Sequence, residues 1–268
     1  MNLSSFTNLI VTYNSANDIL NLLADLRTHA PASRTILIDN ASQDATVKLV
    51  REHYPEMQLI ENLTNLGFAR AVNQGFELCD TPYILLLNPD IRIASPKVFA
   101  ALEASLRSSP RVAATAPLQF KSDEKKRHLN FSWSYTNLES FKLYLAFLFH
   151  QAGSFPTSMQ VTFLNGGCLF VRRSSFYRVG QLNEKYFLYG EEPDLFLKFK
   201  RFGFQCYLLT DVDVTHYRER SLNTVPFPQR MRIKLQAALN VIDALVTGWW
   251  RILFDKLTVR RARKMEGN

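Results

Sequence analysis

The sequence predicts an α/β fold in which a doubly wound, mostly parallel sheet is flanked by helices and followed by a C-terminal helical extension. Between residues 9 and 87, short apolar runs alternate with segments whose apolar residues recur at helical spacing. Such alternation is typical of a parallel sheet with crossover helices. The composition, 47% hydrophobic and 21% charged over 268 residues, indicates a globular chain with a large core.

The pattern divides the chain into three segments, residues 1–118, 119–220 and 221–268. In the first, we expect strands at 9–11, 35–38, 57–60, 83–87 and 112–116, and helices at 19–26, 45–53, 68–78 and 97–106. In the second, residues 119–162 break the pattern and suggest an insertion, before a strand at 168–171, a helix at 194–202 and a strand at 204–209. From residue 230 onward the chain looks helical and basic.

Composition also excludes several classes of protein. Cys79, Cys168 and Cys206 are widely spaced and odd in number, which argues against a disulfide framework or a cysteine zinc site and suits a reducing cytosol. The N-terminus lacks the pattern of a secretory signal, which argues against a secreted protein.

The longest nearly uncharged stretch, 236–250, still contains Asp243 and falls short of the ~20 apolar residues that cross a bilayer, so no span is expected. The net charge of +8 predicts an anionic partner without choosing among nucleic acid, membrane and phosphorylated substrates.

Polar residues gather where four expected strands end. The carboxyl ends of parallel strands border the crevice in which open α/β sheets bind their ligands. The residues there are Thr12, Asn14, Asp39, Asn40, Asn65, Gly67, Asn88 and Asp90. The alternative is that they are turn formers, since Asn, Asp and Gly populate many such loops. Asp39 suits a base or ribose, and Asp90 suits a hard cation; no P-loop or G-x-G-x-x-G pattern is present.

These segments resemble family 2 inverting glycosyltransferases of the GT-A fold, a Rossmann-like architecture, and in particular the rhamnosyltransferase-like branch. The resemblance rests on Ile10–Asn14, Ile38–Ser42, Asn65–Ala69 and Leu87–Asp90, and continues through Asn165-Gly166-Gly167, Tyr186–Leu195 and His216. It implies that residues 1–118 bind a nucleotide-diphosphate sugar. Residues 119–220 would then bind the acceptor and complete the catalytic half of the same domain.

The resemblance also implies a divalent cation, Mg²⁺ or Mn²⁺, on the diphosphate. The family's D-x-D signature reads Asn88-Pro89-Asp90 here, so Asp90 alone keeps a carboxylate and Asn88 offers a neutral oxygen. His216 is implied as the second metal ligand, with Asp211 and Asp213 as nearby alternatives and a purely structural histidine as the simpler interpretation. Arg70 would contact the diphosphate, unless it is an ordinary solvated helix arginine.

The general base is expected in the acid cluster Glu191–Asp194, which follows the aromatic run Tyr186–Tyr189. The resemblance assigns that role to Glu192, supported by Asp194, although the family usually has Asp at this position and Glu191 remains a contender. The alternative is a helix N-terminus, where carboxylates are favoured by the helix dipole.

The acceptor implied is a glycan or saccharide on a polyprenyl diphosphate, with rhamnose arriving from deoxythymidine-diphosphate rhamnose in cell-surface polysaccharide (O-antigen type) synthesis. We expect a cytoplasmic protein, peripheral on the inner face of the membrane, whose basic tail from Arg230 either packs as a terminal helix or lies on anionic lipid. No nucleic-acid partner is expected, since positive charge collects at the C-terminus and not in the crevice. Two rival classes are a nucleic-acid binder and a catalytically silent sugar-nucleotide-binding module.

Overall fold

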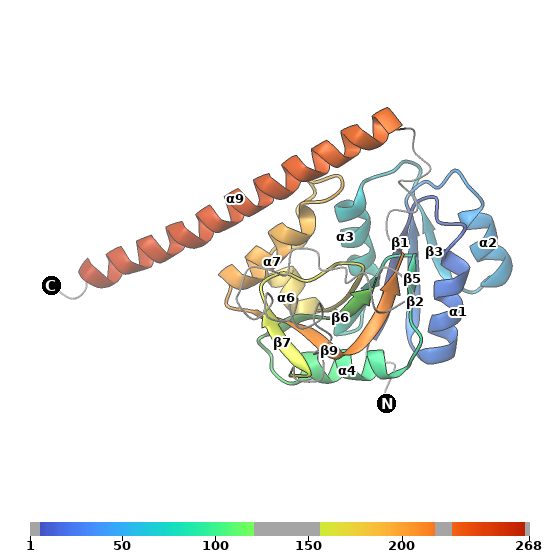
Figure 1. The fold of residues 1–268 in the computed structure, drawn as a ribbon, viewed down its shortest axis with the longest axis horizontal. Coiled ribbons are helices and arrows are strands. Elements are labelled where there is room, and N and C mark those ends of the chain that lie inside the picture. The colour runs from blue at the N-terminus through green and yellow to red at the C-terminus, as the bar shows by residue number, and fades with distance from the viewer. Residues whose placement is uncertain (1–5, 121–155, 218–226, 266–268) are drawn as a thin grey trace, which may run out of the picture.

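The computed structural model describes residues 6–120, 156–217 and 227–265, which form a layered α/β domain with a long terminal helix (Figure 1). Nine strands of these described residues make one mixed sheet in the order β3-β2-β1-β4-β8-β6-β9-β5, with β7 paired to β9. The strands are β1 (Phe6–Thr12), β2 (Arg34–Asp39), β3 (Gln58–Glu61), β4 (Tyr83–Leu87), β5 (Ile91–Arg92), β6 (Val112–Phe120), β7 (Ser158–Val161), β8 (Cys168–Arg172) and β9 (Gln205–His216).

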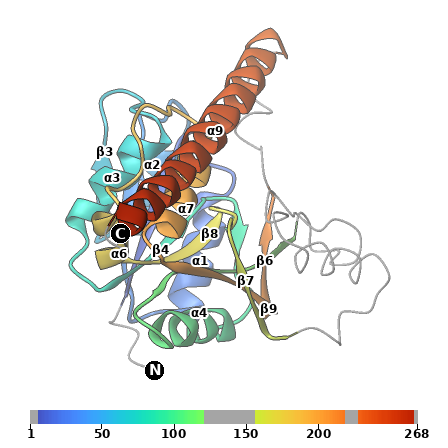
Figure 2. The ribbon, with the colours of Figure 1, turned by 90° about the vertical axis from the view of Figure 1, so that its left-hand side faces the viewer.

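Helices cover both faces of this sheet. They are α1 (Ile19–His29), α2 (Thr46–His53), α3 (Phe68–Leu78), α4 (Lys97–Arg107), α6 (Arg173–Arg178), α7 (Glu191–Arg201) and α9 (Phe227–Met265). One apolar core joins the sheet to α1, α2 and α4, and a second joins it to α3, α6 and α7. The helix α9 lies outside α7 and extends past the body of the domain (Figures 1 and 2).

The strand sequences explain the two cores. Side chains alternate between the faces of a strand, so a strand buried on both faces is apolar throughout. In β1, Leu9 and Val11 face the α3 side, whereas Phe6 and Ile10 face the α1 side. The predicted continuous apolar runs are therefore strands covered by helices on both sides.

The parallel half of the sheet matches the expected pattern, and the other half is mixed. Strands β3, β2, β1 and β4 are parallel to one another, as predicted. Strand β8 runs antiparallel to both β4 and β6, while β9 is parallel to β6 and antiparallel to β5 and β7. The strand-ending loops of β1, β2 and β4 consequently still meet at one edge, next to the ends of β6 and β9.

The segment expected as an insertion, at about 119–162, has strand residues at both of its ends. Strand β6 continues to Phe120, because Leu118–Phe120 resume pairing with β9 after a register shift, and residues 158–161 form the edge strand β7. The remainder of that segment, 121–155, lies outside the described residues.

The C-terminal extension is a single helix, α9. Within the described residues, its section from Arg230 to Asp255 is long and apolar enough to cross a bilayer by length and composition alone. An 18-residue stretch of it has a mean hydropathy of 1.3, and 17% of that stretch is buried. The expectation of no span is therefore wrong by that measure, because the helix continues on both sides of residues 236–250.

Candidate functional site

The loops after β1 and β2 are joined by the carboxylate of Asp39. Its Oδ1 accepts hydrogen bonds from the hydroxyls of Thr12 (2.9 Å) and Ser42 (2.6 Å), and its Oδ2 accepts one from the amide of Ser42 (2.8 Å). Thr12 and Asp39 are both buried. A buried carboxylate requires such donors. Asp39 thus holds the two loops together from beneath the expected donor crevice.

Asn40 extends this network to the loop before α3. Its amide nitrogen donates to the Asn65 side chain (2.8 Å) and to the carbonyl of Gly67 (3.3 Å), while its oxygen accepts from the amide of Leu66 (3.0 Å). Gly67 has a φ of +85°, and a Cβ there would lie 2.7 Å from the carbonyl oxygen of Phe187. The glycine is therefore required for the close approach of the 187 segment, whose carbonyl accepts from the amide of Phe68 (2.9 Å).

Asn14 sits in the left-handed region with a φ of +51°, which Asn tolerates better than most residues. Its Oδ1 accepts from the amide of Gln43 (2.7 Å). Nearby, Asp44 accepts from Ala16 and Thr46. Burial works to raise the pKa of Asp44, but these hydrogen bonds outweigh it and leave the pKa below its usual value. These hydrogen bonds tie the β1 loop to the β2 loop.

Arg70 is on the first turn of α3 and is more than half exposed. Its Nε forms an ion pair with Glu184 (3.2 Å), and the other oxygen of Glu184 accepts from Asn73 (3.0 Å). Arg70 is therefore paired within the protein, so it is not simply a solvated helix arginine. The ion pair does not test whether Arg70 contacts a diphosphate. Arg70 remains a proposed donor contact at the rim.

Strand register brings Asp90 to His216. Asp90 directly precedes the two-residue strand β5, in which Ile91 pairs with His216 at the end of β9. The Oδ1 of Asp90 lies 3.3 Å from Nε2 of His216. The side-chain amide nitrogen of Asn88 also lies 3.3 Å from Nε2 of His216. Residues more than a hundred positions apart therefore meet at the carboxyl end of β4, where the sequence predicts a metal.

Gln119 determines how the His216 ring is presented. Its Nε2 donates to the carbonyls of Asn165 (3.0 Å) and Cys168 (3.4 Å), so its Oε1 faces Nδ1 of His216 at 3.0 Å. Nδ1 must then carry the hydrogen in neutral imidazole, and the lone pair of Nε2 points toward Asp90. Metal-bound histidines are oriented by this kind of second hydrogen bond. A cation suits the place where two acceptors face each other.

Two consecutive glycines separate this pair from the acid cluster. A Cβ on Gly167 would collide with the His216 ring, and a Cβ on Gly166 would collide with Oε1 of Glu192. Because consecutive Cα atoms are only ~3.8 Å apart, the His216 ring and the Glu192 carboxylate lie against neighbouring points of one backbone segment. The candidate metal ligands and the candidate base thus belong to one site.

The three acids at the start of α7 have different surroundings. Glu191 and Asp194 are buried, whereas Glu192 is partly exposed. Asp194 forms an ion pair with Lys198 within the helix (2.7 Å). Burial, together with the charge of Glu192, raises the pKa of Glu191 to about 8. Of the three, Glu192 is the carboxylate that an acceptor can reach.

The raised pKa of Glu191 predicts a pH-dependent stability. Between its unfolded value near 4.5 and about 8, the folded protein holds a proton that the unfolded chain has lost. The stability that this proton provides is complete below pH 4.5 and is lost by up to about 1.4 kcal/mol per pH unit as the pH rises toward 8. We expect Glu191→Gln to gain stability relative to the wild type across this window in urea unfolding. An unchanged difference at pH 5 and pH 8 would contradict this.

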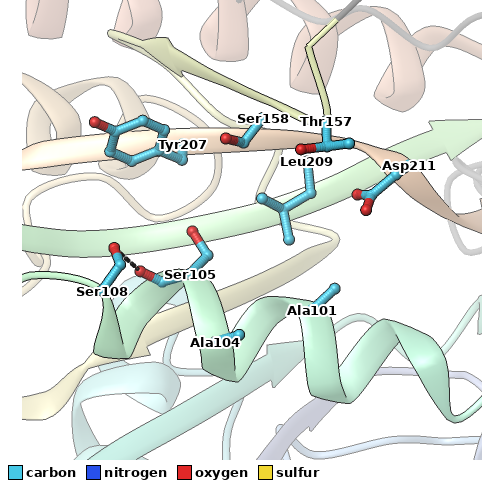
Figure 3. Close-up of a pocket in the computed structure, with 9 residues that line it drawn as sticks. All are labelled: Ala101, Ala104, Ser105, Ser108, Thr157, Ser158, Tyr207, Leu209 and Asp211. Atoms are coloured by element: carbon cyan, nitrogen blue, oxygen red, sulfur yellow. Dashed lines mark hydrogen bonds between the residues drawn. The ribbon is translucent and has the colours of Figure 1, made fainter.

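The alternative metal ligands do not join the pair. Asp211 lines a separate pocket of about 360 Å³ between α4, β7 and β9, with Tyr207 and Ser105 among its neighbours (Figure 3). Among the described residues, no group of three His, Cys, Asp or Glu side chains could hold a metal ion, so Asp213 does not complete a cluster either. Asp90 and His216, with Asn88, would be the protein's contribution to a bound cation.

Sequence reasoning missed Gln119 as the partner of His216. Ninety-seven residues separate the two, and a glutamine near a strand end carries no recognisable signal. The glycine pair was visible in the sequence, but its role depends on what packs against it. The three cysteines are free and buried.

Comparison with known proteins agrees with this geometry. The family described as "Glycosyl transferase family 2" matches residues 8–180. The chain is 27% identical over 263 residues to an N-acetylglucosaminyl-diphospho-decaprenol L-rhamnosyltransferase of Mycobacterium tuberculosis, covering 90% of this chain and 85% of that one. It is 24% identical over 220 residues to rhamnosyltransferase WbbL of Escherichia coli K12, covering 78% and 82% respectively.

Solved structures show the same GT-A fold. A mannosyltransferase from Pyrobaculum calidifontis, in complex with GDP-Man and Mn²⁺, superposes with a TM-score of 0.60 at 16% identity, covering 95% of this chain and 75% of that one. GalNAc-T7 with UDP, GalNAc and Mn²⁺ gives 0.63 at 16% identity, covering 80% and 44%. The family match spans well over half of the chain and includes the β1, β2 and β4 loops described above. The chain therefore belongs to glycosyl transferase family 2 and is a glycosyltransferase.

Proposed function

We propose that the protein is an inverting rhamnosyltransferase that moves rhamnose from deoxythymidine-diphosphate rhamnose to a hydroxyl of a lipid-linked saccharide during cell-surface polysaccharide synthesis. The observation that carries the proposal is the meeting of Asp90, His216 and Glu192 around Gly166-Gly167. The names of the relatives from M. tuberculosis and E. coli support rhamnose, and the first of these names also supports a saccharide diphosphate on a polyprenol as acceptor.

The donor would occupy the crevice formed by the loops that follow β1, β2 and β4. The base and ribose would lie over Thr12, Asn14, Asp39 and Asn40, and the diphosphate would lie near Gly67, Arg70 and Asn88. Asp39 is buried beneath its loop, so its contribution is to hold Ser42 and Thr12 in place and to offer at most one remaining lone pair. Asn65 would act similarly by shaping the turn at Gly67.

A divalent cation would be held by Asp90 and His216, beside Asn88, whose side-chain amide group lies against Nε2 of His216. Mg²⁺ is usually bound through one or two carboxylates, with substrate phosphates and waters completing the shell, so a small protein ligand set fits such an ion. When bound, the cation offsets the negative charge that the departing diphosphate acquires. The replacement of the first aspartate of the D-x-D signature by Asn88 predicts weaker metal affinity in the absence of donor.

Glu192 would act as the general base. Its carboxylate takes the proton of the acceptor hydroxyl as the hydroxyl oxygen attacks the anomeric carbon of the sugar from the face opposite the diphosphate. The bond between that carbon and the phosphate oxygen breaks, and the nucleoside diphosphate leaves with its electron pair, which inverts the anomeric centre. Asp194, paired with Lys198, and the protonated Glu191 would position the first turn of α7.

The donor can be identified with a thermal-shift panel of nucleotide sugars, with and without Mn²⁺. A ligand that binds only the folded protein stabilises it by RT ln(1 + [L]/Kd), or about 2.7 kcal/mol at a hundred times Kd. We expect deoxythymidine-diphosphate rhamnose to give the largest shift and Mn²⁺ to increase it. If no pyrimidine-diphosphate sugar shifts the melting temperature, the donor assignment fails.

A further inference from the structure

One side of α9 is an exposed apolar stripe. Its side chains are between 48% and 65% exposed and recur at intervals of three or four residues, which places them on one face of the helix. The stripe consists of Met231, Leu235, Leu239, Ile242, Val246, Trp250 and Leu253. At 1.5 Å per residue it is about 33 Å long. Exposed apolar surfaces of this extent mark interaction sites in soluble domains.

The opposite side of α9 is fastened to the body of the protein. Ala244, Gly248 and Ile252 are buried, and a Cβ on Gly248 would collide with Leu197 of α7. Figures 1 and 2 show α9 running alongside α7. This contact fixes which face of the helix points outward.

The acidic residues of α9 are both engaged in that contact. Asp243 pairs with Lys185 (2.7 Å) and accepts from the hydroxyl of Tyr186 (2.7 Å), and Asp255 pairs with Arg201 (2.5 Å). The helix holds nine Lys and Arg against these two Asp, a net charge of +7 out of the chain's +8. The outward side is therefore apolar along its middle and carries no unpaired acid among its described side chains.

We propose that α9 docks the protein on an anionic lipid bilayer, lying in the plane of the interface with the apolar stripe inserted between headgroups. Apolar insertion and attraction of Lys and Arg to anionic lipid act together in such helices. Trp249 and Trp250 are of the residue type enriched at this depth of a membrane. The nine basic residues of α9 lie toward the two ends of the helix in sequence, at 230–234 and 251–264.

Two other arrangements fit the observations less well. A second copy docked through the same stripe would bring two helices of +7 together, which like-charge repulsion opposes. A helix that crosses the bilayer would have to separate from α7. It would then lose the contacts that Asp243, Gly248 and Asp255 make with the rest of the protein. Docking in the plane keeps every one of these contacts.

The docked helix also supports the candidate active site. Asn240 of α9 donates to the carbonyl of Leu188 (3.1 Å) and packs at 2.9 Å from the Cβ position of Gly190, whose φ is +97°. Gly190 directly precedes Glu191 and Glu192. Docking would therefore set the acid cluster near the membrane surface. This consequence rests on the proposed lipid-linked acceptor, whereas the docking itself does not.

The test is co-sedimentation of the full-length protein with phosphatidylcholine vesicles and with vesicles of equal parts phosphatidylcholine and phosphatidylglycerol. We expect binding to the anionic vesicles and much weaker binding to the neutral ones. Ile242→Glu should lower the partition coefficient at least about 10-fold, because it replaces an isoleucine side chain that would insert into the bilayer by a charged side chain. Gln236→Glu is the matched control, since it adds the same charge on another exposed side of α9, and it should lower binding by no more than about 5-fold.

Equal binding to both vesicle types, equal losses in the two variants, or no binding by the wild type would overturn the proposal. So would a stable dimer in light scattering that Ile242→Glu dissociates, or vesicle-bound protein that resists alkaline carbonate extraction. Matching melting temperatures of the two variants show that both fold. The donor-induced thermal shift should survive in Ile242→Glu, so failure of docking and failure of the donor assignment give different results.

Discussion

Glu192→Gln is expected to lower the rate of sugar transfer by about 10²–10⁴-fold, the usual contribution of a positioned general base. Glutamine keeps the size and hydrogen-bonding shape of the side chain but cannot take the proton of the acceptor hydroxyl. The carboxylate lies against Gly166, one residue from the glycine that packs on His216, so the substitution removes the base without displacing the glycine pair. The measurement is kcat at saturating donor and acceptor.

Two controls show whether the effect is specific to this carboxylate. Glu77→Gln makes the same chemical change on an exposed position of α3 and should leave kcat unchanged. Glu191→Gln should retain most of the activity at pH 7, because burial and the charge of Glu192 raise the pKa of Glu191 to about 8 and the native side chain is then largely neutral already. Loss of transfer in Glu191→Gln with retention in Glu192→Gln would reverse the assignment.

Asp90→Asn is expected to abolish the dependence of donor binding and turnover on Mn²⁺. The substitution removes the carboxylate from the proposed ligand set and leaves His216 with a neutral neighbour. Losing even an outer partner of a metal ligand costs about 10–100-fold in metal affinity or activity, so the loss here should reach at least about 100-fold at limiting Mn²⁺. Turnover measured across a titration of Mn²⁺ checks this.

A chelator provides the internal control for this prediction. It should lower the activity of the wild type toward the level of Asp90→Asn, and it should lower the variant no further. Asp80→Asn changes an aspartate whose side chain is 79% exposed in a surface ion pair with Arg34, and it should keep the full response to Mn²⁺. A wild type whose activity is indifferent to chelation would remove Asp90 and His216 from the role of metal ligands.

The fold was predictable where local pattern and burial agree. In β1, β2 and β4 the apolar runs are strands covered on both faces, and their periods differ clearly from those of α1 and α3. The mixed half was not predictable in detail, because β5 has two residues and exists through its pairing with β9, and β6 resumes after a register shift. Such pairings depend on contacts between residues far apart in sequence.

The candidate site was predictable as a set of strand ends but not as a geometry. Strand-end position places Asn40, Asn88 and Asp90 at the crevice, since the carboxyl ends of neighbouring parallel strands converge there. The distance from Asp90 to His216 follows from the register of β5 on β9, and the presentation of the His216 ring follows from Gln119. Neither feature leaves a trace in local sequence.

The C-terminal helix shows the same limit in another form. Its basic and apolar residues are evident from the sequence, but which of them face outward depends on Gly248 and Asp243 docking on the body. Over all of α9 the apolar residues are spread around the helix, so the exposed stripe becomes clear only after the α7 contact has been identified.

We propose that the two parts of the site have separate roles: the strand-end loops with Asp90 and His216 hold the donor, and Glu192 performs the proton transfer. Calorimetric titration of deoxythymidine-diphosphate rhamnose into Glu192→Gln, in the presence of Mn²⁺, tests it most directly. We expect a dissociation constant within about 3-fold of the wild-type value, a difference of under about 0.7 kcal/mol, in a variant that no longer transfers sugar. Loss of donor binding in parallel with loss of transfer would contradict it.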